Sequence, residues 1–293
     1  MDGPRMSLTP DELGAVKAAL TGPHGASLME LMHRLTTGGR PKGDFSDDVL
    51  TLAEDLGWID RGHFATKLGW KMGDPIRELV NWNKRDRKVH DWEQLPVLRA
   101  EHFEGKDLLS IGCGCGTNLF SFQTMCKSVV GLEVEPIYLQ FTPIWAELSG
   151  VPTPKTVHSG AEHMPFDDGS FDVIVCLGAL QYMNIQRVLH EVSRVLRPGG
   201  MAIFTLSDLR GYVTELSSRV FTFRRPQQFI REGAMFANMI VYPWVGRVIV
   251  RPFDPVYPRV KRIRRWFADA DLDMDDTLTV PYQHEYCYVV RRR

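Results

Sequence analysis

Apolar residues recur at helical spacing in the first third of the chain and form short continuous runs after about residue 106. Thr9-Pro10-Asp11-Glu12 combines a capping threonine, a proline at the first helical position and a glutamate two residues later, and Gly22 ends the predicted helix. Ser27 and Glu30 repeat the capping spacing at a second predicted start. A third helix is predicted from Ser46 to Leu56, with Gly57 as its C-cap.

A hairpin is expected after these helices. Trp58-Ile59 and Phe64-Ala65-Thr66 would be its arms, joined by the turn Asp60-Arg61-Gly62. Three helices followed by a hairpin is the order of a winged-helix module. Asp74-Pro75 then predicts the start of a longer helix that continues to about Trp92 and connects to a second domain. We therefore expect a winged-helix-like domain over residues 1–100 and the second domain over residues 101–293.

Strands and helices alternate from Lys106 onward. This alternation predicts parallel strands with right-handed crossovers, which is an α/β fold with a Rossmann-like, doubly wound, mostly parallel sheet. An antiparallel hairpin, Asp273–Val280 with Glu285–Arg291, is expected to close the sheet after a helix over Arg259–Ala268. The other predicted strands are Asp107–Ile111, Ser128–Glu133, Lys155–His158, Phe171–Leu177 and Met201–Leu206, and the helices between them lie near Asn118–Cys126, Pro136–Leu148 and Ile185–Leu196.

The first of these strands leads into a glycine-rich turn, Gly112-Cys113-Gly114-Cys115-Gly116-Thr117. Glycine permits positive φ and lets a ligand approach the main chain closely. In open α/β sheets such a turn lies at the carboxyl ends of the strands, where ligands bind. Thr117 stands where a dinucleotide fingerprint has its third glycine, which argues against NAD or FAD. The turn suits a ligand without pyrophosphate whose amino-acid end lies against it.

The second strand ends in an acid, Glu133. A carboxylate at this point can accept two hydrogen bonds from a ribose diol, so an adenosyl ligand is expected. The alternative is a solvated acid at a strand end. Two further motifs come later in the chain: the polar loop from Gly160 into the strand at Phe171, and the turn Leu196–Gly200 before the strand at Met201.

Together these four segments resemble the class I S-adenosylmethionine-dependent methyltransferases, close to the group of small-molecule and quinone-biosynthesis enzymes. The resemblance covers about Lys106 to Leu206 well and Arg259 to Arg291 weakly. It implies S-adenosyl-L-methionine as cofactor. Many relatives have an acid where Gly160 stands, so a side-chain bond to the adenine amine is not expected here. The cofactor-binding residues that the resemblance implies are Gly112, Cys113, Gly114, Gly116, Asn118, Glu133, Val134, Gly160, Ala161, Glu162, Leu177 and Gly178.

Several side chains near these motifs have a functional and a structural interpretation. His158 and His163 are candidate bases or simply polar edge groups, and Tyr182 is a substrate contact or part of the core. Cys113 and Cys115 are two thiols without a second Cys or His pair, so no metal site is expected. No catalytic residue is assigned. Methyl transfer from a sulfonium needs mainly alignment and exclusion of water, and a general base only when the acceptor must lose a proton.

The segment after the strand at Met201, about residues 207–256, is longer than a simple connection and rich in aromatic residues and arginine. We interpret it as a cap over the acceptor pocket, with Phe229 and Arg231 as representative substrate contacts. Aromatic rings and arginines suit an apolar acceptor that carries an anionic group. The alternative is that the aromatic residues form the core of an extra helical layer.

The composition of the chain argues against a nucleic-acid-binding, a secreted and a membrane protein. The formal net charge of −1 gives no general field for nucleic acid, and 44% hydrophobic residues allow a globular core. Met1 to Pro10 is unlike a signal peptide, and the apolar run Phe171 to Leu180 is too short to span a bilayer. Five cysteines without a scaffold pattern suit a reducing cytoplasm. A cytoplasmic protein without a membrane partner is therefore expected.

The sequence favours a biosynthetic methyltransferase acting on a small organic molecule, with an N-terminal domain that supports the pocket or a homodimer. A DNA-binding regulator with a methyltransferase-fold sensor is an alternative from another class. The predicted recognition helix counts against it, because Asp47, Asp48, Glu54 and Asp55 are its charged residues and would repel phosphate. An RNA methyltransferase is a third possibility, supported only by the arginines of the cap.

Overall fold

The computed structural model describes residues 7–36, 45–84, 98–207, 260–282 and 285–293, and the chain divides into two compact units. The first unit comprises Met1–His90, Cys113–Ser121 and Glu135–His158. The second comprises Asp91–Gly112, Phe122–Val134 and Ser159–Arg293. Each unit thus contains segments that lie far apart in the sequence, and each is described by itself.

The first unit begins with three helices, α1 (Pro10–Thr21), α2 (Gly25–Thr36) and α3 (Asp47–Asp55). The capping box predicted for α1 is present, since the Thr9 hydroxyl accepts from the Glu12 amide and the Glu12 carboxylate accepts from the Thr9 amide. The predicted start of α2 at Ser27 is wrong, because the helix already begins at Gly25. The Leu28 amide accordingly donates to the carbonyl of His24 at 2.9 Å.

Helix α4 (Lys67–Lys84) begins earlier than predicted, and Pro75 lies inside it. Thr66 supplies the start, because its hydroxyl accepts from the Gly69 amide at 3.1 Å. Pro75 removes one helical donor without ending the helix, and the residue is buried in the unit. The predicted hairpin before α4 is reduced to a single antiparallel bridge between Ile59 and Ala65. The N-terminal helices therefore have the predicted order but not all of the predicted bounds.

One apolar core joins the N-terminal helices to α6 (Pro136–Ser149), which lies much further along the chain. Met72 and Ile76 of α4 share it with Phe141 and Trp145 of α6. The Gln140 side chain also pairs with both backbone groups of Leu8 at 2.8 Å. Most of α5 (Thr117–Phe122) and strand β3 (Lys155–His158) complete the unit.

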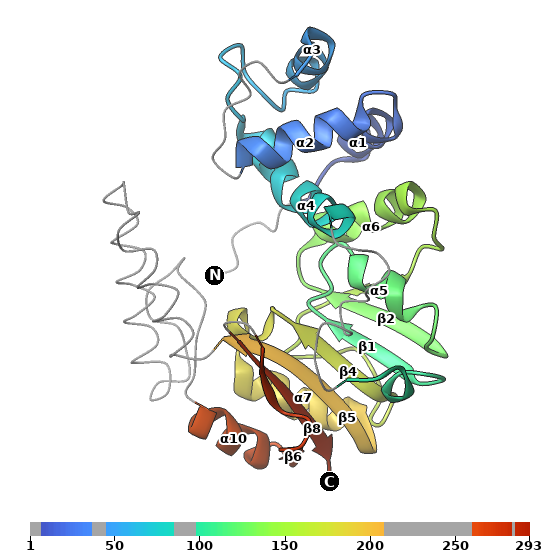
Figure 1. Ribbon diagram of the computed structural model, residues 1–293, viewed down its shortest axis with the longest axis vertical. Coiled ribbons are helices and arrows are strands. Elements are labelled where there is room, and N and C mark those ends of the chain that lie inside the picture. The colour runs from blue at the N-terminus through green and yellow to red at the C-terminus, as the bar shows by residue number, and fades with distance from the viewer. Residues whose placement is uncertain (1–6, 37–44, 85–97, 208–259, 283–284) are drawn as a thin grey trace, which may run out of the picture. The chain divides into compact units, whose positions relative to one another are not determined.

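The second unit is built on a mostly parallel sheet, as predicted. Its strands lie in the order β2 (Ser128–Glu133), β1 (Asp107–Ile111), β4 (Phe171–Leu177), β5 (Leu196–Ser207), β8 (Glu285–Arg292) and β6 (Leu272–Met274) (Figure 1). β1 pairs in parallel with both β2 and β4, and β8 runs antiparallel to β5. The carboxyl ends of β1, β2 and β4 therefore meet at one edge of the sheet.

Both faces of this sheet are covered, which accounts for its continuous apolar strands. On one face, Val173 and Ile203 pack with Phe103 and Phe122. On the other face lie α7 (Ile185–Val195) and α10 (Val260–Asp269), and Phe267 of α10 stacks on Phe204 of β5 with ring centroids 5.6 Å apart. A short 3-10 turn, η2 (Ala100–His102), precedes β1.

The closing hairpin differs in one arm from the prediction. β8 is where it was expected, but the predicted strand Asp273–Val280 is divided into β6 and β7 (Val280–Tyr282). Between them, the Asp275 side chain accepts from the Thr277 amide and hydroxyl. This local turn replaces the ladder hydrogen bonds that a continuous strand would make.

The predicted cap over residues 207–256 and the end of the predicted connector helix lie outside the described residues.

Among the helices that the structure describes, none has the length and apolar character needed to cross a bilayer.

Gly69 and Gly14 provide a matched test of the first unit's packing. A Cβ added at Gly69 would lie 2.0 Å from the Trp58 carbonyl oxygen, whereas Gly14 of α1 has nothing within 4 Å. We expect Gly69→Ala to lower the free energy of unfolding by about 1–3 kcal/mol or more, because backbone must move. Gly14→Ala should raise it by about 0.5–1 kcal/mol through helix propensity. Urea denaturation measures both, and equal effects of the two substitutions would contradict the packing described.

Candidate functional site

The turn between β1 and α5 has the conformation that the sequence predicts. Gly112, Gly114 and Gly116 have φ values of 65°, 56° and 81°. L side chains rarely adopt this region, so glycine removes a strain that any other residue would carry. Cys113, between the first two glycines, is buried, and its thiol is directed at the Gly114 carbonyl at 3.7 Å. Asn118, another predicted contact, lies half-buried in the first turn of α5.

Neighbouring side chains also lie close to the three glycines of this turn, most tightly and with least freedom to move at Gly112. A Cβ at Gly112 would lie 2.5 Å from the Cβ of Ala179. A Cβ at Gly114 would lie 2.4 Å from a carboxylate oxygen of Glu78, and one at Gly116 would lie 3.3 Å from the Thr142 methyl. Within the second unit, Ala179 thus approaches Gly112. Within the first unit, Glu78 approaches Gly114 and Thr142 approaches Gly116.

Glu78 of α4 is a residue at this turn that the sequence analysis missed. Both of its carboxylate oxygens lie 3.0 Å from the Cys115 amide nitrogen, and Oε1 also accepts from the Thr117 hydroxyl at 2.9 Å. Its dense surroundings withdraw the carboxylate from water and raise the pKa of Glu78 above its ordinary value. No local sequence signal marks Glu78, because only the packing of α4 in the first unit brings it to the turn.

Glu133 ends β2 in the second unit, as predicted, and is only 8% exposed. One carboxylate oxygen accepts from the Val134 amide at 2.8 Å, and the Ser159 amide donates to the Glu133 carbonyl at 3.0 Å. The alternative of a solvated acid at a strand end is therefore wrong. A carboxylate at the carboxyl edge of a parallel sheet is a group that can accept hydrogen bonds from a ribose diol.

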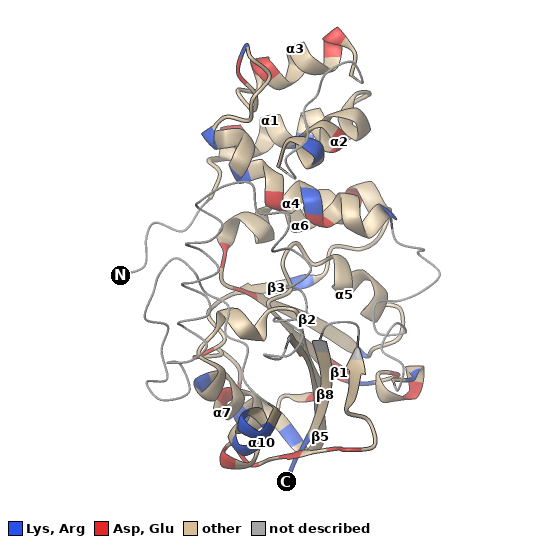
Figure 2. Cartoon of the chain, turned by 60° about the vertical axis from the view of Figure 1, so that its left-hand side comes forward, with Lys and Arg blue, Asp and Glu red and all other residues tan. Residues whose placement is uncertain are grey.

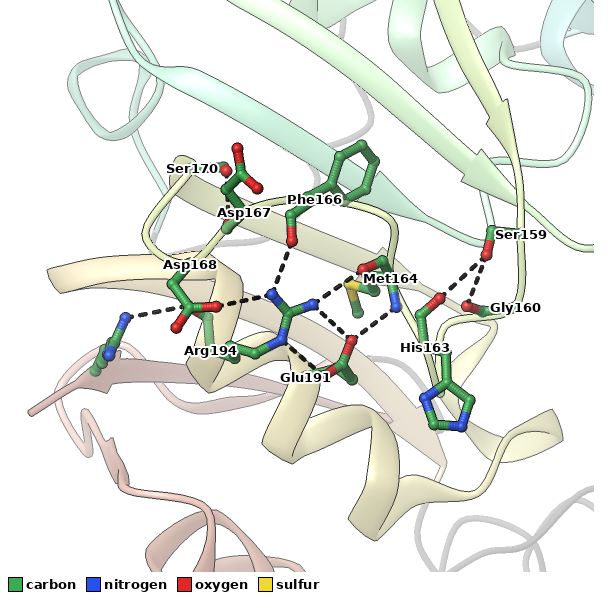
Figure 3. Close-up of polar contacts among 11 residues, drawn as sticks. Ser159, Gly160, His163, Met164, Phe166, Asp167, Asp168, Ser170, Glu191 and Arg194 are labelled. Carbon is green, nitrogen blue, oxygen red and sulfur yellow. Dashed lines mark hydrogen bonds and ion pairs between the residues drawn. The ribbon is translucent and has the colours of Figure 1, made fainter.

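The loop from Ser159 to Ser170 carries the predicted adenine-side residues. Ala161 is buried and Gly160 is half-buried. The carboxylate of Glu162 accepts from the Asn184 amide at 2.9 Å, so this side chain is joined to the start of α7. The Ser159 hydroxyl donates to the carbonyls of Gly160 and His163 at 3.4 and 3.1 Å (Figure 3).

Arg194 holds the other end of this loop against α7 (Figure 3). Its guanidinium donates to the carbonyls of Phe166 and Met164 at 2.7 and 2.9 Å, and to Asp168 at 2.9 Å. Glu191 joins the cluster by pairing with Arg194 at 2.8 Å and by accepting from the Met164 amide at 2.7 Å. The hydrogen bond from Arg194 lowers the pKa of Glu191. Arg194 thus positions the loop, although it lies outside every motif that the sequence identified.

The residues at and after the end of β4 differ in burial and polarity. Leu177 is half-buried, and Gly178 has a φ of 70° and donates to the Thr205 hydroxyl at 2.8 Å. Gln181 is buried; its amide donates to the Gly178 carbonyl at 2.9 Å, and its own oxygen has no hydrogen-bond partner among the described residues. Tyr182 is 62% exposed, so the alternative of core packing for this residue is wrong.

Thiols and histidines offer little reactive chemistry here. Burial raises the pKa of Cys176 to about 12 and raises the pKa of Cys115 well above its ordinary value, so both thiols stay protonated near neutral pH. His158 and His163 are exposed. Within the described residues, no three Cys, His, Asp or Glu side chains gather as metal ligands would. The predicted substrate contacts Phe229 and Arg231 lie outside the described residues.

Comparison with known proteins identifies the part of the chain that contains this site. Residues 109–204 match a family model described as a methyltransferase domain. This range holds the glycine turn, Glu133, the loop anchored by Arg194 and the end of β4.

Two curated relatives are similar over the same region. An uncharacterized methyltransferase of Bacillus subtilis is 30% identical over 124 residues, which are 40% of this chain and 47% of that protein. The phthiotriol/phenolphthiotriol dimycocerosates methyltransferase of Mycobacterium leprae is 35% identical over 113 residues, which are 37% of this chain and 40% of that protein. The chain therefore spans about half, or less, of the length of these relatives.

Among solved structures, the PH0226 protein of Pyrococcus horikoshii is similar with a TM-score of 0.51 and 18% identity, over 72% of this chain and 93% of that one. At this identity the likeness concerns the fold, and it agrees with the Rossmann-like sheet of the second unit.

Arg194 allows a test of how the loop is positioned. Arg194→Ala should lower the free energy of unfolding by about 1–3 kcal/mol, because two loop carbonyls and two carboxylates lose a charged donor. The lowered pKa of Glu191 implies stability that is present above the ordinary glutamate pKa and lost as pH falls through the value in the folded protein. The difference between wild type and variant should therefore narrow in acid. Arg187→Ala, an exposed change on the same helix, is the control, and a pH-independent difference would contradict this account.

Proposed function

Because residues 109–204 are a methyltransferase domain of the class I S-adenosylmethionine-dependent family, we propose that this protein transfers the methyl group of S-adenosyl-L-methionine to a small organic acceptor. The observation that carries the proposal is the joint occurrence of a main-chain turn shaped by three glycines and a buried acid, Glu133, at the end of the next strand. The resemblance to the family assigns both features to cofactor binding.

The residues present fit this cofactor. Glycine at three positions of the turn permits a close approach of the methionine portion to the main chain, and the carboxylate of Glu133 is an acceptor for the ribose hydroxyls. Val134 and Ala161 supply apolar surface beside the adenine, and Leu177 with Gly178 would face the transferable methyl. The unpartnered oxygen of Gln181, among the described residues near the end of β4, is a buried acceptor that a bound molecule could satisfy.

The sulfonium of the cofactor supplies an already activated methyl group. The chain's own residues then have to orient the two reactants in line and exclude water from them. A general base is needed only for an acceptor that must lose a proton. The described residues around β4 are consistent with this division of work, since the thiols are protonated and the histidines are exposed.

An apolar acceptor with an anionic group is the class that we favour. Tyr182, exposed after the end of β4, offers an aromatic surface. The aromatic and arginine-rich segment 207–256 follows β5 directly in the sequence. The mycobacterial relative is named for the methylation of phthiotriol and phenolphthiotriol dimycocerosates, which are organic acceptors.

For the N-terminal helices we propose a role in supporting the pocket or forming a homodimer, in preference to DNA binding. Asp47, Asp48 and Asp55 of α3 are exposed, and Figure 2 shows α3 with acidic residues at its ends. A phosphate backbone would be repelled by this helix. The helices instead share a core with α6, which follows the ribose-binding strand in the sequence.

The proposed cofactor can be tested by calorimetry. Wild-type protein should bind S-adenosylmethionine and S-adenosylhomocysteine but not NAD. Glu133→Ala should weaken binding about a hundredfold or more, because two charge-assisted hydrogen bonds of about 1.5–3 kcal/mol each are lost. Glu104→Ala removes an exposed carboxylate from the same unit and should leave affinity unchanged. Binding by Glu133→Ala at wild-type strength would remove this residue from the site.

Substitutions in the segment 207–256 should affect binding of the acceptor and leave binding of the cofactor nearly unchanged. Replacing Phe229 and Arg231 together by alanine should raise the acceptor's KM or abolish turnover, while cofactor affinity stays within a few-fold. A thermal-shift titration with cofactor, run beside the activity assay, measures both. A lowered melting temperature together with weaker binding of both ligands would instead identify these side chains as part of a structural core.

A further inference from the structure

The carboxylate of Glu78 lies directly against the main chain of the glycine turn. Its Oε2 occupies the position beside Gly114 where a side chain would stand, 2.4 Å from where a Cβ on that glycine would lie. Its two oxygens share the Cys115 amide at 3.0 Å. These contacts all lie within the first unit, and they fix the carboxylate at the turn that the proposed function assigns to the methionine portion of the cofactor.

The hydrogen bonds to Glu78 leave its charge uncompensated. Two carboxylate oxygens offer about four acceptor directions. All of its hydrogen-bond donors are neutral groups: the Cys115 amide, which both oxygens share, the Thr117 hydroxyl, and also the Cys115 thiol and the Thr117 amide. Among the described residues, no Lys, Arg or His forms an ion pair with Glu78. A carboxylate drawn partly out of water without a cation is costly unless something else supplies the positive charge.

The amino-acid end of the proposed cofactor contains one ammonium and one carboxylate. A fixed negative charge at the turn attracts the ammonium and repels the carboxylate, so it selects which of the two groups lies beside Gly114 and Cys115. An ammonium has three donors and no acceptor, and it would supply the positive charge that the neutral donors around Glu78 do not supply.

We propose that Glu78 binds the α-ammonium group of the methionine portion of the cofactor. The inference rests on the proposed function and extends it. It gives helix α4 a direct part in cofactor binding, and it makes the protein selective for adenosyl compounds that carry a free amino group. Thr117 and the Cys115 amide then hold the carboxylate in place for this contact.

The test compares three proteins with three ligands by calorimetry. The proteins are wild type, Glu78→Gln, which keeps an acceptor for Thr117 but removes the charge, and Asp74→Asn. Asp74 lies on the same helix, is exposed and pairs with Arg77 at 2.8 Å, so its substitution is a matched loss of one negative charge. The ligands are S-adenosylhomocysteine, its deaminated analogue and 5′-methylthioadenosine, which lacks the amino-acid end.

We expect Glu78→Gln to weaken S-adenosylhomocysteine binding by roughly tenfold or more, as for the loss of a charge-assisted hydrogen bond. The other two ligands should bind Glu78→Gln within about twofold of wild type, and Asp74→Asn should behave as wild type with all three. Wild type should also prefer S-adenosylhomocysteine to the deaminated analogue by roughly tenfold. This last measurement needs no variant and holds even if Glu78→Gln does not fold.

Three results would overturn the proposal. An equal loss for all three ligands would show that Glu78 only supports the turn. Tighter binding of S-adenosylhomocysteine to Glu78→Gln would show that the carboxylate competes with the ligand's own carboxylate for the Cys115 amide. Equal affinity of wild type for the amino and deaminated compounds would exclude an ammonium contact. If wild type bound none of the three, the proposed function itself would fail, which is a distinguishable outcome.

Discussion

The candidate site depends on the backbone path from Ile111 to Thr117, where three positive φ angles occur within five residues. An L residue at each of these positions would cost about 1–2 kcal/mol in backbone conformation alone. At Gly112 the Cβ of Ala179 adds steric exclusion, so glycine is required there both for the direction of the chain and for the space beside it, and the space beside Gly114 is taken by the carboxylate of Glu78. In that space Glu78 accepts from the Cys115 amide. The charge that strengthens this hydrogen bond is also the feature that a cationic ligand group would recognise.

The loop from Ser159 to Ser170 is stabilised in a different way. It has no ladder of its own, and its carbonyls at Met164 and Phe166 are satisfied by one guanidinium, that of Arg194. A planar fork of donors can serve several carbonyls at once, which suits a loop that must keep one shape without regular structure. Glu191 and Asp168 balance the charge. The parallel sheet thus supplies the strand ends, and α7 supplies the side chains that hold the loop beside them.

Local sequence signals determined much of this fold. Continuous apolar strands with glycine turns and helices between them predicted the parallel sheet. The capping box at Thr9 predicted the start of α1. The strand pattern and the capping box could both be recognised because each acts within a few residues of the chain. Ser27 and Asp74-Pro75 also resembled helix starts, yet α2 already begins at Gly25 and α4 begins before Asp74. Both Gly25 and Pro75 are buried in the first unit, so packing there accompanies the longer helices. The turn at Asp275 likewise divided a predicted strand, since its side chain competes with the ladder for the backbone.

The sequence also predicted the candidate cofactor motifs, because glycine at a turn and an acid at a strand end can be recognised from the local backbone pattern. Only the tertiary structure placed Glu78 against that turn and Arg194 under the loop. A carboxylate in a helix or an arginine in an amphipathic segment has no local feature that distinguishes a solvated charge from a buried contact. Their roles follow from which backbone donors and acceptors the packed core leaves unsatisfied, and that is decided by contacts between segments far apart in the chain.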